Sequence, residues 1–432
     1  MLRDELYEAI CEMPVVDVHS HVNRDHMAAA KPEQVMFYHM LLYCLRSGGA
    51  ADEKMWPEKE AGRHGLPLPD FFARWPAVAQ TGFGWILKTI LRDLYEWEGP
   101  LTAENLPRIR EAFEAKTGQK DWAKQVLAKA NVVRLCSSQV KVNPVPEGQW
   151  DGNIRFTLER APTSGTSEFR SWKQRLEAVG KILGRDVATV EHLREAVARF
   201  YEGFDWSDKK ALVAWVSSEA DFRPVDEAHL NRLLADAQAD KALDADGVRF
   251  LEAALIRAIC RAIRSRTRIF QFCYGVQYLT PDPGCGHPVA RAAPEFASSC
   301  GHLFGEFPDL HFNVLNGYEP DEPIWAAMCQ AYGNVSLANF WWETFYPSVM
   351  HTALARRFDM VPLSRLIGFF SDGWCVEYVY GRLQVVRRVL ANVLAERIER
   401  GFWTREEALA SAREILFETP RRIFLPDEDV RA

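Results

Sequence analysis

The sequence lacks the features that mark several large classes of protein. Its 432 residues contain no run of about 18 apolar residues, the length needed to span a bilayer. Basic residues are not in excess, because the formal net charge is -7, so no surface for nucleic acid is indicated. The acidic start, Met1-Leu-Arg-Asp-Glu, is unlike a secretory signal, which opens with basic and then apolar residues. We therefore expect a cytoplasmic protein that binds neither membrane nor nucleic acid.

Cysteines at disulfide-forming or metal-binding spacings are also missing. The nine cysteines stand singly and form no Cys-x-x-Cys pair. An odd count without such spacing predicts neither a disulfide framework nor a zinc ribbon. Reduced thiols are the plain interpretation for a chain without an export signal.

Three common catalytic signatures are absent as well. We find no Gly-x-Ser-x-Gly nucleophile elbow, no phosphate-binding P-loop and no His-Glu-x-x-His zinc motif. Metal chemistry at another arrangement of residues is the enzymatic interpretation that remains.

What the chain does have is a series of short β-rich runs that alternate with helical patterns. Their apolar residues face both sides, which is typical of strands buried in a parallel sheet. Eight repeats predict an α/β fold, a (β/α)₈ TIM-type barrel formed by residues 1–432 as one domain. A doubly wound sheet is the alternative, but no Gly-x-Gly-x-x-Gly turn follows any run. The predicted strands span residues 14–21, 131–136, 153–158, 211–216, 269–274, 311–315, 335–340 and 366–370.

Two long connections interrupt the repeat. Residues 22–130, after the first strand, look largely helical and predict an insertion over the barrel mouth, where the loops that follow strands build active sites. Residues 281–301 are rich in Pro, Gly and Ala and predict a lid loop. Helices at 2–11, 248–264, 380–397 and 405–417 complete the predicted pattern.

Two histidines close the first predicted strand. Residues two apart on a strand point to one face, so His19 and His21 could bind one metal. Such a pair can also arise by chance among eleven histidines. Asp372 follows the eighth predicted strand, which adjoins the first in a closed barrel. We predict that it completes the metal site and can also accept a proton, although Asp-Gly is also a common turn signal.

Other residues are weaker candidates for chemistry. His39 could carry a proton, because an imidazole titrates near neutral pH. Trp341 and Trp342 follow the seventh strand and could stack on a sugar, although tryptophans more often fill a core. His287 and His302 flank the predicted lid and are more often surface residues, and His311 begins a strand and is expected to be structural.

At these positions the chain resembles the uronate isomerases of the amidohydrolase superfamily. Asp17-Val-His-Ser-His21 is similar to the metal-binding pair of that family, and the resemblance spans most of the chain. Further matches are Phe71-Phe-Ala-Arg-Trp-Pro76, Asn131-Val-Val-Arg-Leu-Cys136, Asn334-Val-Ser-Leu-Ala-Asn-Phe-Trp-Trp342, Pro362-Leu-Ser-Arg-Leu-Ile-Gly-Phe-Phe-Ser-Asp372 and residues 377–390.

The resemblance implies one divalent metal, in the first place zinc and otherwise manganese, and interconversion of an aldose uronate with its ketose. It implies that His19, His21 and Asp372 bind the metal. It further implies that Asp372 and His39 are catalytic candidates and that Trp341 and Trp342 contact the substrate.

Several positions of the family pattern are changed here. Trp374 stands where the family has an arginine, and we take it as a candidate substrate contact. Met40 replaces a tyrosine and Cys273 a histidine, and the acidic pair and the Ser-Asp-His run become Gln139-Val140 and Ser217-Ser218-Glu219. A guanidinium fork is the usual grip on a carboxylate, so Arg155 or Arg160 is the candidate replacement.

Two enzymatic hypotheses follow. The first is a metal-dependent isomerase of a uronate or related sugar acid. The second is a metal-dependent hydrolase or lyase of the same superfamily, acting on a carbohydrate-derived lactone, amide or acid. A non-catalytic binding protein is a third hypothesis, and it would tolerate alanine at His19 or Asp372. A small-molecule sugar acid as partner and a homo-oligomeric state complete the expectations.

Overall fold

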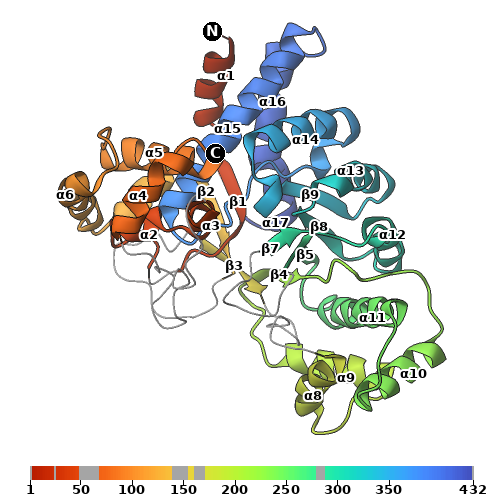
Figure 1. Cartoon of the computed structure of the whole chain (residues 1–432). Helices are drawn as coiled ribbons and strands as arrows, with labels where there is room; N and C mark the ends of the chain where they lie inside the picture. The colour runs from red at the N-terminus through yellow and green to blue at the C-terminus, as the bar shows by residue number, and fades with distance from the viewer. Residues whose placement is uncertain are drawn as a thin grey trace.

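The computed structural model describes residues 2–23, 26–47, 68–138, 154–159, 171–278 and 288–430. At its centre lies a parallel sheet, and helices surround it (Figure 1). Within the described part, the strand order is β1-β2-β3-β4-β5-β8-β9, and every neighbouring pair is parallel. The predicted α/β class is therefore confirmed.

Seven of the eight predicted strands form where the sequence placed them. All six residues of β1 and all six of β5 are buried, as expected for a sheet that is covered on both faces. The strands are β1 (Val15–Ser20), β2 (Val132–Ser137), β3 (Ile154–Glu159), β4 (Lys209–Trp215), β5 (Ile269–Tyr274), β8 (His311–Asn316) and β9 (Val335–Phe340).

The eighth predicted strand, residues 366–370, does not form as a regular strand. It makes one bridge, Leu337 with Leu366, and Ile367 donates to the Leu337 carbonyl at 3.1 Å. The next backbone N–H, that of Gly368, turns away and donates to the Ile415 carbonyl of the C-terminal helices at 2.7 Å. Backbone groups that bond to a helix cannot join a strand ladder, which explains the correction.

The same segment nevertheless reaches β1 on its other side. Asp372 N–H donates to the His19 carbonyl at 2.9 Å, and His21 N–H donates to the Gly373 carbonyl at 2.8 Å. In addition, the carboxylate of Asp17 accepts the Ser371 N–H at 3.0 Å. Residues 366–373 therefore lie between β9 and β1.

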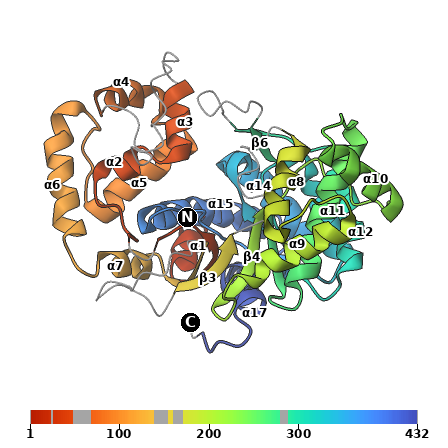
Figure 2. The same ribbon diagram turned by 90° about the horizontal axis from the view of Figure 1, so that it is seen from below.

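The described residues between β1 and β2 form mainly helices. Figures 1 and 2 show these helices gathered on one side of the molecule, opposite α8–α12. α5 begins at a cap in which the Thr81 hydroxyl accepts the Gly84 N–H at 3.1 Å, and its apolar face packs on α15. The helices are α2 (Pro32–Met36), α3 (His39–Ser47), α4 (Leu68–Val78), α5 (Gly82–Tyr95), α6 (Leu106–Thr117) and α7 (Trp122–Lys129).

The remaining helices cover the sheet. The helices predicted at 2–11, 248–264 and 380–397 are confirmed as α1, α11 and α15, and α16 runs on into a π-helix at Glu414–Glu418. None of the helices in the described ranges is both long and apolar enough to cross a membrane. They are α1 (Leu2–Cys11), α8 (Trp172–Leu183), α9 (Val190–Glu202), α10 (Glu227–Gln238), α11 (Ala245–Ile263), α12 (Phe296–Glu306), α13 (Glu322–Ala331), α14 (Pro347–Met360), α15 (Val376–Glu399), α16 (Arg405–Arg413) and α17 (Thr419–Phe424).

The predicted lid loop, residues 281–301, is not a loop throughout. Residues 281–287, with His287, lie outside the described residues. β7 (Pro288–Ala290) pairs antiparallel with β6 (Val276–Tyr278), and residues from Phe296 onward belong to α12. Phe296 and Cys300 are buried, and this apolar helix face accounts for the difference from the prediction.

Candidate metal centre

The two histidines at the end of β1 project to the same side, as their spacing predicts. Their ring centroids are 5.0 Å apart, and the rings are nearly perpendicular, at 84°. His19 is 2% exposed, so it lies inside the fold near the carboxyl end of the strand. His21 comes directly after the strand and is only partly buried.

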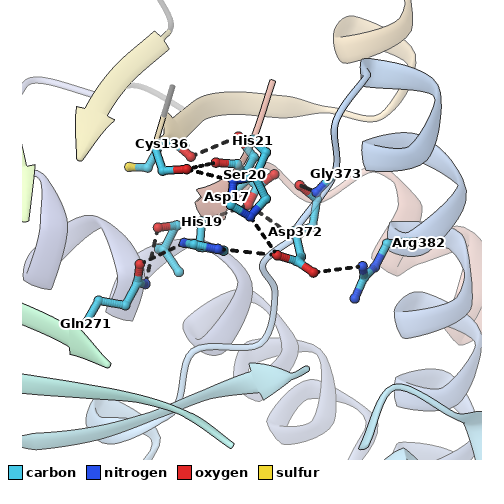
Figure 3. Close-up of polar contacts among 12 residues, drawn as sticks. Asp17, His19, Ser20, His21, Cys136, Gln271, Asp372, Gly373 and Arg382 are labelled. Carbon is cyan, nitrogen blue, oxygen red and sulfur yellow. Dashed lines mark hydrogen bonds and ion pairs between the residues drawn. The ribbon is translucent and has the colours of Figure 1, made fainter. Parts of the chain in front are cut away.

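Asp372 meets these histidines from the opposite end of the chain (Figure 3). Its Oδ1 lies 3.1 Å from Nε2 of His21 and 3.4 Å from Nε2 of His19. The backbone at Asp372 is left-handed, with φ of 50°, a conformation that Asp adopts more readily than most residues. One ligand atom from each of the three residues lies within 4.8 Å of the others.

Each of the three side chains is held on its far side by another residue, and Figure 3 shows Gln271 beside His19 and Arg382 beside Asp372. Nδ1 of His19 lies 3.1 Å from Oε1 of Gln271 in β5, and Nδ1 of His21 lies 2.8 Å from the Ser138 hydroxyl after β2. Oδ2 of Asp372 lies 3.6 Å from Nη1 of Arg382 in α15. Two Nε2 atoms and one carboxylate oxygen are thereby left facing a common point.

This set of donors fits a divalent metal. Two imidazole nitrogens and one carboxylate oxygen are a donor set found in catalytic zinc sites, where the protein supplies three ligands. Burial by itself raises the pKa of Asp372. Its contacts with His19 and His21 and the positive charge of Arg382 outweigh this effect and hold the pKa of Asp372 well below its usual range. The carboxylate therefore stays ionised, as a ligand must.

Aromatic residues form the surroundings of the cluster. The Trp374 ring stacks on the His21 ring, with centroids 4.5 Å apart and planes inclined by 17°. Arg382 lies over the Phe345 ring at 4.0 Å and is 1% exposed. The Tyr38 hydroxyl donates to the Asp372 carbonyl at 2.9 Å. These side chains thus pack against the residues of the cluster.

No protein-family model matches the chain, but individual known proteins are similar to it over nearly its whole length. A uronate isomerase of Thermotoga petrophila is 22% identical over 442 residues, which cover 97% of this chain and 96% of that protein. The solved uronate isomerase of Thermotoga maritima superposes with a TM-score of 0.80 at 18% identity, over 98% of this chain and 97% of that one. The glucuronate isomerase of Caulobacter crescentus gives 0.77 at 14% identity, over 99% and 94%. The chain resembles uronate isomerases over its whole length.

The predicted tryptophan pair lies mostly inside the fold. Trp341 and Trp342 are 3% and 8% exposed, and Trp341 packs edge-on against Trp215 with centroids 5.0 Å apart. Trp342 has a φ of 48°, a strained conformation for a bulky residue and one that is typical of functional sites. Trp215, at the end of β4, is 47% exposed and was not predicted.

Other predicted residues are placed less fully. His39 begins α3 and Arg155 lies in β3, but their side chains, like Arg160, Gln139 and Val140, lie outside the described part. Cys273 is buried in β5 and is not one of the three clustered ligands found among the described residues. His311 contacts Ser336 at 2.8 Å. Burial, with Arg365 nearby, lowers the pKa of His311 to about 4, which agrees with a structural role.

The sequence analysis did not find the residues that hold the ligands. Gln271 is the one amide in the otherwise apolar strand Ile-Phe-Gln-Phe-Cys-Tyr, and Arg382 is a charge within a buried helix. Buried polar residues need partners, so each could have been flagged as unusual. The sequence could not have named their partners. Gln271 contacts His19, which lies more than 250 residues away in the chain, and Arg382 of α15 contacts Asp372, which lies outside that helix.

Proposed function

We propose that the protein is a metal-dependent aldose–ketose isomerase of a uronate or a related sugar acid. The observation that carries this proposal is the cluster of His19, His21 and Asp372 in a chain that resembles uronate isomerases from end to end. The substrate class comes from those relatives, and the cluster supplies the chemistry that such a reaction needs.

The proposed fold is a closed (β/α)₈ barrel in which residues 366–373 take the place of the eighth strand. Backbone hydrogen bonds from this segment to both β9 and β1 support closure. The ligand candidates lie at the carboxyl ends of strands, which is where barrel enzymes build their active sites. The helices within 22–130 are proposed as an insertion of this single domain.

The proposed metal ligands are Nε2 of His19, Nε2 of His21 and Oδ1 of Asp372. Imidazole and carboxylate donors suit zinc, with manganese as the alternative. When bound, such a metal polarises a substrate oxygen beside the carbon that exchanges its proton.

The remaining steps fall to side chains of the chain itself. Asp372, with its low pKa and its ion pair to Arg382, suits a ligand better than a proton acceptor. His39 is therefore the proposed carrier of the proton between C1 and C2. Trp374, Trp341 and Trp342 are proposed substrate contacts, and Arg155 is the proposed partner of the substrate carboxylate.

Metal content and activity test this proposal together. We expect close to one equivalent of zinc or manganese by elemental mass spectrometry, and reversible conversion of an aldose uronate to its ketose. His21→Ala should lose both, whereas His302→Ala, on the exposed face of α12, should lose neither. Protein that stays free of metal after reconstitution would refute the proposal.

One observation favours a hydrolase or a lyase as the second candidate function. Within the described residues around the cluster, the arginine in contact with the ligands is Arg382, and it is already paired with Asp372. A substrate without a carboxylate would suit such a site. Uptake of ¹⁸O from labelled water into the product of a lactone or amide would identify a hydrolase, because an isomerase consumes no water. Cytoplasmic location and a homo-oligomeric state stay predictions.

A further inference from the structure

A line of buried polar side chains crosses the interior of the sheet from His19 to His311. Successive contacts measure 3.1 Å from His19 to Gln271, 3.0 Å from Gln271 to Asn313, 2.8 Å from Asn313 to Ser336 and 2.8 Å from Ser336 to His311. The three middle residues are fully buried. Strand register aligns them, because Gln271 is opposite Asn313 and Asn313 is opposite Ser336.

The orientation of Gln271 is fixed by a backbone group. Its Nε2 donates to the Val18 carbonyl at 3.3 Å and to Oδ1 of Asn313 at 3.0 Å, and a carbonyl oxygen can only accept. The amide oxygen must then face His19, as Figure 3 shows. Since that oxygen also only accepts, Nδ1 of His19 carries the ring proton.

The same direction continues to the far end of the line. Asn313 accepts through Oδ1, so its Nδ2 donates to the Ser336 hydroxyl oxygen. That hydroxyl also contacts Nε2 of His311 at 2.8 Å. The hydrogen bonds from His19 through Gln271 and Asn313 to Ser336 thus point in one direction, and bonds aligned in this way polarise one another in a medium of low dielectric constant.

This tautomer determines what Nε2 of His19 can offer to the metal centre. A neutral imidazole with its proton on Nδ1 presents a lone pair on Nε2. This lone pair faces the ionised carboxylate of Asp372 at 3.4 Å, and two electron-rich atoms so placed are stabilised by a cation between them.

We infer that Gln271, Asn313 and Ser336 form a one-directional hydrogen-bond relay that fixes the tautomer of His19 and so presents its Nε2 to the metal. Gln271 is the positioning residue in contact with His19. This inference rests on the proposed metal site. A network that only satisfied buried polar groups would stabilise the fold without selecting a tautomer.

The ring nitrogen shifts of His19 test the relay in metal-free protein. With ¹⁵N-labelled histidine, and His19→Ala to assign the signal, we expect the wild type to show the proton on Nδ1. Gln271→Met should give a mixture of tautomers and bind zinc about 10- to 100-fold more weakly. Gln384→Met is the matched control, because Gln384 is also buried but accepts a hydrogen bond from Tyr7 of α1. It should change neither reading.

Ser336→Ala provides a milder variant in case Gln271→Met fails to fold. It should shift the Nδ1–H resonance of His19 and weaken zinc binding two- to threefold. An unchanged tautomer in Gln271→Met, or an unmoved resonance in Ser336→Ala, would overturn the relay. If the wild type binds no metal, the proposed function fails. The tautomer of His19 in the metal-free protein still shows whether the relay exists.

Discussion

At the scale of single residues, the guanidinium group of Arg382 lies beside one oxygen of the Asp372 carboxylate. The guanidinium is 1% exposed and lies 3.6 Å from Oδ2, while Oδ1 faces the histidines. One oxygen is therefore held by the protein and the other is turned toward the metal position. A buried carboxylate without this cation would take up a proton more readily, because burial disfavours its charged form.

Replacing this arginine should make metal binding sensitive to acid. In Arg382→Met the pKa of Asp372 rises, so a proton competes with the metal at low pH. We expect zinc affinity to fall about tenfold, and to fall further at pH 5 than at pH 8. Competition with a chelator across this range measures it. Arg388→Met, on the exposed side of the same helix, should follow the wild-type curve, and an identical curve for Arg382→Met would rule out the role.

At the scale of elements, Glu377 ties α15 to the helices that follow β1. Its carboxylate accepts three hydrogen bonds, from Ala29 N–H at 3.0 Å, the Tyr95 hydroxyl at 2.8 Å and Nε1 of Trp122 at 3.1 Å. These donors come from the loop before α2, from α5 and from α7. Because α15 begins four residues after Asp372, this junction also fixes the end of the segment that carries Asp372.

Removing the junction should destabilise the whole fold. Glu377→Leu leaves three buried donors without an acceptor, each at a cost of about 1–3 kcal/mol. We expect the free energy of unfolding, measured by urea titration, to fall by at least about 3 kcal/mol. Glu399→Leu, at the exposed end of the same helix, should change it by less than about 0.5 kcal/mol. Equal effects from the two variants would contradict the assigned role.

At the scale of the whole molecule, an early and a late segment of the chain lie side by side. β1 bonds to residues 372 and 373, and α1 packs on α15. The interior of the fold holds ionisable groups whose pKa values differ from those of the unfolded chain. Burial raises the pKa of Asp17 to about 6, despite hydrogen bonds from Ser371 and His19, and lowers that of His311 to about 4.

The pKa of His311 predicts part of the acid sensitivity of the fold. Between pH 6.5 and 4 the unfolded chain takes up a proton that native His311 does not, so stability falls as the pH falls through this window. The loss amounts to at most roughly 3 kcal/mol. Asp17 acts in the opposite sense, since its raised pKa lowers stability as the pH rises toward 6.

Comparing variants isolates the histidine. His311→Gln should flatten the fall in unfolding free energy between pH 6.5 and 4, measured by urea titration at each pH. His302→Gln, at an exposed position of α12, should retain the wild-type slope. A His311→Gln profile parallel to that of the wild type would show that this imidazole does not oppose acid unfolding.

The sequence by itself determined most of the local elements and predicted the cluster of His19, His21 and Asp372. Alternation of apolar strands and amphipathic helices is a short-range pattern, and it located seven strands and the helices α1, α11 and α15. The spacing of His19 and His21 also fixes a common face, because side chains two apart on any strand share it.

The tertiary structure alone decided the rest. The Gly368 N–H donates to a carbonyl in a helix 47 residues later in the chain. The sequence therefore could not show that residues 366–370 form no regular strand. The relay from Gln271 and the pairing of Arg382 with Asp372 depend on side chains from different elements. Such contacts form only when strand register and helix packing bring those elements together. No local pattern records them, because their energy comes from neighbours that are distant in sequence.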